Sequence, residues 1–173
     1  EADAMVLDLY NRLPEIRITD LLLDVDDEIG FTEAFTHLRT GVPCKDRVGM
    51  LNVLLAEGLN LGLSKMAGAT NTHDYFQLSR LSRWHVESEA MARALAIVIE
   101  GQSALPMARF WGGGTSASSD GQFFSTTRQG EAMNLINAKY GHEPGLKAYT
   151  HVSDQFGPFA TQTIPATVNE APY

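Results

Sequence analysis

One carboxylate, Asp120, stands inside a run of glycine, small polar and aromatic residues that extends from Trp111 to Phe124. A carboxylate on a rigid strand can bind a divalent metal ion, and Mg²⁺ takes one or two protein carboxylates together with phosphate oxygens. Paired ions of this kind clamp the attacking and leaving oxygens of a phosphoryl transfer. The competing interpretation is a hairpin turn at Asp120-Gly121, because Asp-Gly is a common turn dipeptide and aspartate is depleted in strands. Local statistics alone favour the turn.

Other residue types in the chain could also do chemistry, but their spacing gives them little support. The glycines at 112–114 could cradle a phosphate, yet the spacing of a phosphate-binding loop is missing and no lysine follows them. The histidines at 37, 73, 85, 142 and 151 lack the spacing of metal ligands. Cys44 is the single cysteine, and we expect a small, buried, unreactive residue there. Ser118 and Ser119 lie in no nucleophile-elbow motif.

The composition is that of an ordinary globular chain with an acidic N-terminal segment. The 173 residues are 44% hydrophobic and carry a formal net charge of −8. Residues 1–33 contain ten acidic and two basic side chains, so the remainder is balanced in charge. The negative net charge argues against a stand-alone nucleic-acid binder, whereas the balanced remainder leaves DNA contacts open for the later part of the chain. For the acidic segment, a solvated helix face is favoured over an acidic docking site.

The elements expected to position Asp120 begin with helices. Apolar residues recur at helical spacing, and Gly30 and the Gly41–Pro43 break mark two ends. Gly58 and Gly62, one turn apart, would let another element approach closely, and Met91, Leu95 and Val98 would form one buried face. The pattern predicts helices over Ala4–Arg12, from a Thr19-Asp20 cap to Gly30, over Phe31–Leu38, Lys45–Met66, Asp74–Trp84 and Glu87–Gly101.

The last third of the chain is expected to form strands. One strand would contain Gly121–Phe124, and two more, Gly145–Ser153 and Phe159–Ile164, would be joined as a hairpin by the turn residues 154–158. The sequence therefore predicts an α+β fold, with a helical scaffold region over 1–104 and a strand-rich region over 105–173.

Several stretches of the chain resemble one known family in the same order. The strongest is WGGGTSASSDGQ at 111–122. It resembles the start of the catalytic domain of the Tn-three-family transposases, the replicative, cointegrate-forming enzymes of bacterial transposons. The further similar stretches are LPEIRIT at 13–19, FTHLRTG at 35–41, GLNLGL at 58–63, NAKYG at 137–141 and YTHVSDQ at 149–155.

The resemblance implies a ribonuclease H-like fold in which two aspartates and a glutamate hold two Mg²⁺ ions. These ions would activate water to nick the transposon ends and then the freed 3′-hydroxyl to join target DNA. Asp120 matches the first aspartate, and its strand and the hairpin would be the first three strands of the fold. The resemblance therefore favours the interpretation of Asp120 as a catalytic residue and metal ligand over its interpretation as part of a hairpin turn. Asp154 lies in a matched stretch without a catalytic role, so a turn or hydrogen-bond anchor is expected there.

The chain also departs from the family pattern. It ends at Tyr173, before the second aspartate and the glutamate, and it begins without the family's N-terminal DNA-recognition region. We therefore expect an internal fragment, inactive by itself and at most a weak binder of Mg²⁺. Gly113 stands where the family often has aspartate.

The implied partners are transposon ends and target DNA in a bacterial cytoplasm, with no membrane. Candidate DNA contacts are dispersed, and ordinary solvated helix faces are the alternative for them: Arg39, Lys45, Arg47, Lys65, Arg80 and Arg83. A second hypothesis is a non-enzymatic interaction module or truncated remnant, which could dimerise through an exposed edge at Phe159–Ile164. A third, a small-molecule enzyme with a phosphate cradle at 112–114, has the least support.

Overall fold

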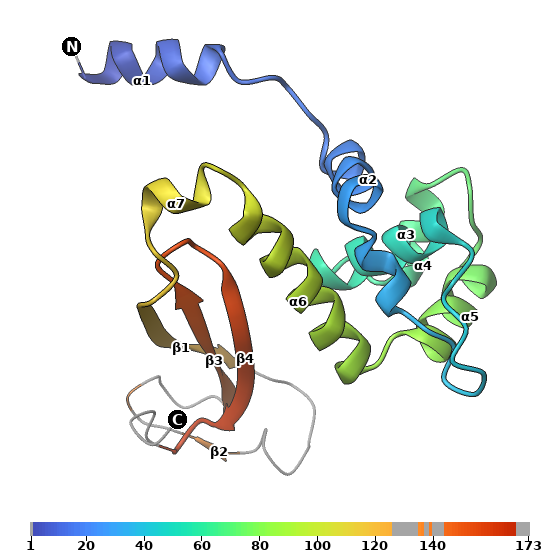
Figure 1. The fold of residues 1–173 in the computed structure, drawn as a ribbon. Helices are drawn as coiled ribbons and strands as arrows, with labels where there is room; N and C mark the ends of the chain where they lie inside the picture. Colours follow the sequence, from blue (N-terminus) through green and yellow to red (C-terminus); the bar gives the residue numbers. More distant parts are fainter. Residues whose placement is uncertain (1, 126–134, 137–138, 140–143, 169–173) are drawn as a thin grey trace. The chain divides into compact units, whose positions relative to one another are not determined.

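The computed structural model describes residues 2–125, 135–136, 139 and 144–168. Two compact units divide the chain, Glu1–Ala94 and Leu95–Tyr173, and each is described by itself (Figure 1). The domain boundary expected after residue 104 remains a prediction. The matched stretch 137–141 lies outside the described residues except for Lys139.

The first unit is built from helices. Its elements are α1 (Ala2–Asn11), α2 (Ile18–Ile29), a short 3₁₀ helix η1 (Phe31–Ala34), α3 (Arg47–Gly58), α4 (Leu63–Ala69) and α5 (Tyr75–His85). Helix α6 (Ser88–Ala104) begins in this unit and ends in the second. The core forms where α3 contacts α4 and α5, and it contains the fully buried side chains of Met50, Val53 and Leu78. Burial of such side chains stabilises the unit by about 1.5–3 kcal/mol each.

The long helix expected over Lys45–Met66 is wrong, because the chain forms two helices with a break between them. Helix α3 ends at Gly58, Asn60 has a positive φ of 52°, and Gly62 has a φ of 75°. The amides of Leu61 and Gly62 both donate to the carbonyl of Ala56, which turns the chain out of the helix. Nothing lies within 4 Å of a Cβ built at Gly58 or Gly62, so these glycines do not serve a close approach. At Gly62 the positive φ is what favours glycine.

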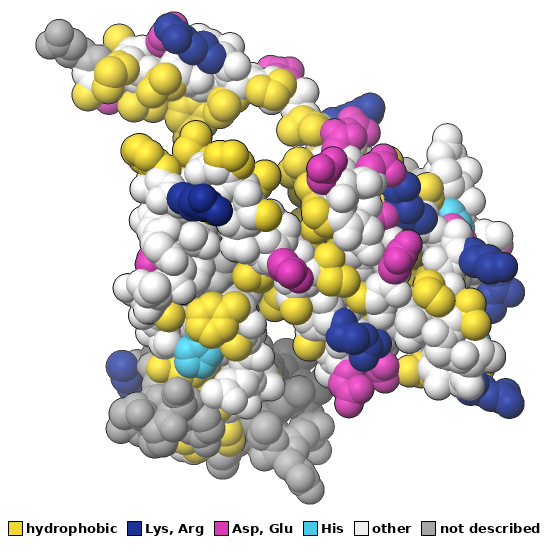
Figure 2. Space-filling model, viewed as in Figure 1, with side chains coloured by type: hydrophobic (Ala, Val, Ile, Leu, Met, Phe, Trp, Pro, Cys, Tyr) yellow, Lys and Arg dark blue, Asp and Glu magenta, His cyan; other side chains and the backbone are white. Residues whose placement is uncertain are grey.

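The apolar face expected on α6 is only partly buried, and the apolar side chains of α1 are exposed. In α6 the buried residues of the first unit are Ala90 and Ala94, whereas Met91 is 44% exposed. In α1 every described side chain is exposed, and Figure 2 shows hydrophobic side chains along this helix. Helical periodicity marks one side of a helix as apolar, but it does not say which side of the helix finds a partner.

Helix ends were predicted with mixed success. Gly30 ends α2 in the left-handed conformation, with φ 65°, and its amide donates to the carbonyl of Asp26, as expected for a helix-ending glycine. The start of α2 differs, because Arg17 occupies the N-cap position without a side-chain bond and the helix already begins at Ile18. Helix α5 begins at Tyr75, one residue after the predicted start, and Asp74 caps it through a reciprocal capping box with Gln77.

The second unit contains an antiparallel sheet, so the α+β class is confirmed. Its strands are β1 (Ala117–Ser125), β2 (Leu135–Ile136), β3 (Pro144–Ser153) and β4 (Pro158–Pro165), and a short helix α7 (Ala108–Trp111) precedes β1. Strand β3 is central, since β1, β2 and β4 all pair with it. The predicted hairpin is confirmed as β3–β4 (Figure 1).

The two faces of the sheet differ in burial. Lys147, Tyr149 and Ile164 are buried on one face, whereas the alternate residues of β1 on the other face are exposed. Alternation along a strand sends successive side chains to opposite faces. No helix among the described residues combines the length and the apolar character needed to cross a bilayer.

Candidate functional site

Asp120 lies within a strand, so the hairpin turn at Asp120-Gly121 is wrong. It is the fourth residue of β1 and stands opposite Thr150 of β3 in an unbroken antiparallel register. The nine paired positions of β1 override the local turn tendency, because the ladder satisfies the backbone groups along the whole strand. The predicted carboxylate on a rigid strand is therefore present, and its side chain is exposed.

Within the described ranges, one oxygen of the Asp120 carboxylate has a hydrogen-bond partner and the other has none. Oδ1 accepts a hydrogen bond of 2.9 Å from the amide of Gly121. Across the strands, the hydroxyls of Thr150 and Thr161 lie 3.2 Å apart. A shallow cavity of about 270 Å³ lies over this face, and it is lined by Ser118, Asp120, Gln122, Phe124, Ala148, Thr150 and Val152.

One hard carboxylate oxygen on a fixed backbone is what a divalent cation such as Mg²⁺ accepts as a single protein ligand. No cluster of three or more His, Cys, Asp or Glu side chains that could hold a metal ion occurs within the described ranges. Asp120 therefore fits as one ligand of such an ion.

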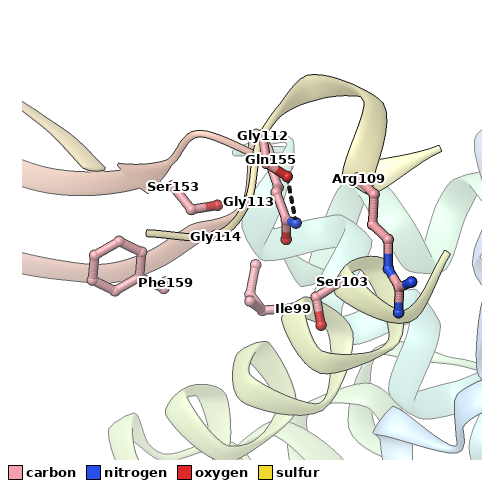
Figure 3. Close-up of a pocket in the computed structure, with 9 residues that line it drawn as sticks. All are labelled: Ile99, Ser103, Arg109, Gly112, Gly113, Gly114, Ser153, Gln155 and Phe159. Carbon is pink, nitrogen blue, oxygen red and sulfur yellow. Dashed lines mark hydrogen bonds between the residues drawn. The ribbon is translucent and has the colours of Figure 1, made fainter. Parts of the chain in front are cut away.

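The loop before β1 is held by the tip of the β3–β4 hairpin. Asp154 Oδ1 accepts from the amide of Gly114 at 2.8 Å, and the Gln155 side-chain amide donates to the carbonyl of Gly112 at 2.9 Å (Figure 3). A Cβ added at Gly112 would lie 2.4 Å from the Asp154 carboxyl carbon, so only glycine fits there. The prediction that Asp154 is a hydrogen-bond anchor is confirmed.

Ser119 and His151 form a pair that the sequence reasoning missed. Ser119 Oγ lies 2.6 Å from His151 Nδ1, because the two residues stand opposite each other in the β1–β3 register. The His151 ring also contacts the rings of Tyr149 and Phe159. Since successive residues of β1 face opposite ways, this pair lies on the other face from Asp120. The pair follows from the register between β1 and β3, and the sequence does not state that register.

Five of the six candidate DNA-contact residues are exposed and have no ion-pair partner among the residues that the structure describes: Arg39, Lys45, Lys65, Arg80 and Arg83. Arg39 lies in the loop after η1. The amide of Leu38 donates to the carbonyl of Trp84, and the ring of His37 stacks on the Trp84 ring. These contacts hold the loop with Arg39 against the end of α5 that carries Arg83.

Arg47, the sixth candidate, is engaged inside the first unit. Its guanidinium forms ion pairs with Asp26 at 2.7 Å and Asp27 at 2.6 Å, and it donates to the carbonyl of Leu23 at 3.0 Å. The hydrogen bond from Arg47 holds the pKa of Asp27 below its usual value, and the same bond raises the pKa of Arg47. Part of the acidic N-terminal segment therefore neutralises a structural arginine. Figure 2 shows further acidic side chains over α2.

Cys44 and His73 have structural surroundings. Cys44 is half-buried, and burial raises the pKa of its thiol, which disfavours a reactive thiolate. Cys44 is therefore less buried than predicted, and the raised pKa agrees with an unreactive thiol. His73 Nε2 lies 2.9 Å from Asp46 Oδ2, while Asp46 Oδ1 caps α3 by accepting from the amide of Gly49.

Comparison with known proteins places these features in a family. The family described as Tn3 transposase DDE domain matches residues 20–173. The chain is 43% identical over 172 residues to the transposase of transposon Tn501 from Pseudomonas aeruginosa, and 41% identical over 172 residues to that of Tn21 from Escherichia coli. It is 32% identical over 181 residues to the transposase of transposon gamma-delta from Escherichia coli strain K12. These alignments cover 99% of this chain but only 17%, 17% and 18% of the three relatives.

Proposed function

This chain belongs to the Tn3 transposase family, the Tn-three family that its sequence resembles, and we propose that it serves in nicking transposon ends and in joining the freed 3′ strand to target DNA. The observation that carries the proposal is the exposed carboxylate of Asp120 on β1, within the part of the chain that matches the family's DDE domain. In this proposal Asp120 is one of the carboxylates that hold the catalytic metal.

The order of the strands supports a ribonuclease H-like assignment. A first long strand carries the carboxylate, and the second long strand, β3, lies between it and the third, β4, with antiparallel pairing on both sides. We propose that this sheet is the opening part of such a fold, with the helical first unit as its scaffold.

We propose Mg²⁺ as the metal. When bound, such an ion supplies neutralisation of phosphate charge and activation of an attacking oxygen. The chain's own contribution is to orient the carboxylate. The β1–β3 ladder fixes the backbone of Asp120, and the Gly121 amide holds Oδ1, while Oδ2 has no hydrogen-bond partner among the described residues. Because Asp120 is a single ligand here, we expect weak metal binding and no DNA cleavage by these 173 residues alone.

The exposed bases of the first unit are proposed DNA contacts. Arg39 and Arg83 support this most, because the loop of Arg39 is bound to the end of α5 that carries Arg83. Lys45, Lys65 and Arg80 are further candidates. Arg47 would have to leave its two aspartates to contact a phosphate, so it is the least suited of the six.

A Mn²⁺ titration followed by backbone NMR tests the role of Asp120. We expect paramagnetic broadening centred on residues 119–122 and their β3 partners at millimolar Mn²⁺. Asp120→Asn should remove it, while Glu100→Gln, which neutralises another exposed carboxylate of the same unit, should leave it unchanged. Broadening that persists in Asp120→Asn, or none in the wild-type chain, would overturn the assignment.

An interaction module is the second candidate function. The observation in its favour is the set of exposed apolar side chains on α1, which include Met5, Leu7, Leu9 and Tyr10. Exposed apolar surface of this kind commonly marks a protein interface. The edge of β4 is the proposed dimer contact, since within the described residues β4 pairs with β3 alone. Light scattering should detect a dimer at high concentration, and a strictly monomeric chain would remove this candidate.

A further inference from the structure

A line of polar side chains crosses the sheet at Asp120. Thr150 of β3 stands opposite Asp120 in the β1–β3 register, and Thr161 of β4 stands opposite Thr150 in the β3–β4 register. Side chains of directly opposite residues project from the same face, with Cβ atoms about 4.5–5.5 Å apart. Asp120 and Thr150 also line the same cavity of about 270 Å³. The carboxylate therefore shares one face of the sheet with two hydroxyl groups.

Thr150 is the polar residue of this cavity that stands directly across from Asp120. The other two, Ser118 and Gln122, lie two residues from Asp120 on β1 itself, about 7 Å along the strand. Thr150 is held from both sides, because β3 pairs with β1 and with β4. A β-branched side chain is also restricted in its rotamers. The sheet therefore fixes the Thr150 hydroxyl relative to the strand of Asp120.

The Thr150 hydroxyl can accept a further hydrogen bond. Its Oγ1 lies 3.2 Å from Thr161 Oγ1, and either hydroxyl can be the donor of this bond. A threonine hydroxyl has one proton and two acceptor positions, so the bond to Thr161 uses either the proton or one of those positions. Since this hydroxyl makes no other hydrogen bond among the described residues, at least one acceptor position of Thr150 stays open in both arrangements.

Asp120 and Thr150 do not hydrogen bond to each other within the described ranges, although they stand opposite in the register. Such a separation suits a hydrated cation. Mg²⁺ loses its water reluctantly, so an ion held by one or two carboxylates keeps several water ligands. The oxygen of a water ligand faces the ion, and its protons need acceptors. An open acceptor position across from the carboxylate meets that need.

We propose that Thr150 is a positioning residue for the metal, and that its hydroxyl accepts a hydrogen bond from a water ligand of the ion that Asp120 binds. The inference rests on the proposed function of Asp120 and deepens it by naming the group that orients the ion's water. Loss of groups that orient metal ligands typically lowers metal affinity 10–100-fold. Because this site is exposed and the contact is one neutral hydrogen bond, we expect a smaller factor, about threefold to tenfold.

A Mn²⁺ titration of the ¹⁵N-labelled 173-residue chain tests the proposal through the paramagnetic broadening of the amides of residues 119–122. Thr150→Val keeps the shape of the side chain and removes the hydroxyl, so half-broadening should require about threefold to tenfold more Mn²⁺. Thr150→Ser keeps a hydroxyl and should bind nearly as the wild-type chain does. Cross-strand NOEs between β1 and β3 report whether the register is kept, and Thr150→Ala is a second variant without the hydroxyl.

A matched control is Thr163→Val. Thr163 is another exposed threonine of β4, opposite Ala148 and two residues beyond Thr161 on the same face, and its replacement should leave the titration unchanged. If Asp120→Asn abolishes the broadening while Thr150→Val and Thr150→Ala bind as the wild-type chain does, the role of Thr150 is refuted and that of Asp120 stands. An equal loss in Thr163→Val also refutes the role of Thr150. Broadening that persists in Asp120→Asn, or none in the wild-type chain, refutes both.

Discussion

Replacing Asp26 by alanine should destabilise the first unit more than any other single carboxylate substitution in α2. Asp26 is only 5% exposed and accepts from both the amide and the hydroxyl of Thr32, at 2.8 and 2.9 Å. It also forms the 2.7 Å ion pair with Arg47. One carboxylate thus connects the end of α2 to η1 and to the first turn of α3.

The expected magnitude follows from what the substitution leaves unpaired. Breaking a buried ion pair by removing one partner costs about 3–5 kcal/mol. The Arg47 side chain is 37% exposed and keeps Asp27 as a partner, so the lower end, about 3 kcal/mol, is expected. For a unit of this size that corresponds to a fall of about 12–24 °C in the unfolding midpoint.

Urea unfolding followed by tryptophan fluorescence measures this change. Trp84 lies in α5 of the first unit and Trp111 in the second, so a Trp111→Phe background isolates the first unit. Asp24→Ala, at an exposed position of the same helix, is the matched control and should change the free energy of unfolding by no more than about 0.5 kcal/mol.

A double variant tests the reason for the loss. If the cost comes from an uncompensated arginine, Asp26→Ala combined with Arg47→Met should recover part of the stability, because a buried pair replaced on both sides is often nearly neutral. The reasoning fails if Asp26→Ala lowers the free energy of unfolding no more than Asp24→Ala does. It also fails if Arg47→Met destabilises the Asp26→Ala chain as much as it destabilises the wild-type chain.

Three smaller perturbations test other contacts. Gly112→Ala should displace the Asp154 carboxylate and destabilise the second unit, while Gly113→Ala, whose Cβ would meet its nearest neighbour only at 3.8 Å, should cost far less by thermal unfolding. Asp74→Ala should cost about 1 kcal/mol through loss of the α5 cap, and Asp74→Asn should restore most of it in the same urea assay. Because the folded-state pKa of Asp27 is lowered, its contribution is present above its unfolded pKa near 3.8 and is lost as pH falls through the lower folded value. Acid titration of Asp27→Asn should therefore show a shallower loss of stability below pH 3.8, and an unchanged profile would contradict the assigned pKa direction.

Local signals in the sequence predicted local features well. Gly30 ends α2, Asp74 caps α5, and the hairpin turn falls where turn residues cluster, because each depends on the backbone preferences of a few neighbours. The family resemblance, not the local pattern, placed Asp120 on a strand. Ladder pairing between residues some thirty positions apart decided that outcome.

Features that depend on distant partners were missed. The periodicity of residues 45–66 continues through the break at Leu59–Gly62, so it predicted one helix where backbone bonds to Ala56 make two. The pairing of Arg47 with two aspartates some twenty residues earlier has no local signal. The sequence also does not indicate that Arg109 lines one cavity with the glycine loop and the tip of the hairpin.

The contact between the glycine loop and the hairpin tip makes two segments forty residues apart dependent on each other. A larger residue at position 112 could be accommodated only if the carboxylate at 154 became smaller or moved, and a change at 154 would release the amide of Gly114. Neither residue can therefore be substituted without a compensating change at the other. Across related chains we expect substitutions at 112 and 154 to occur together, and a loop transplanted without its hairpin should lose its shape.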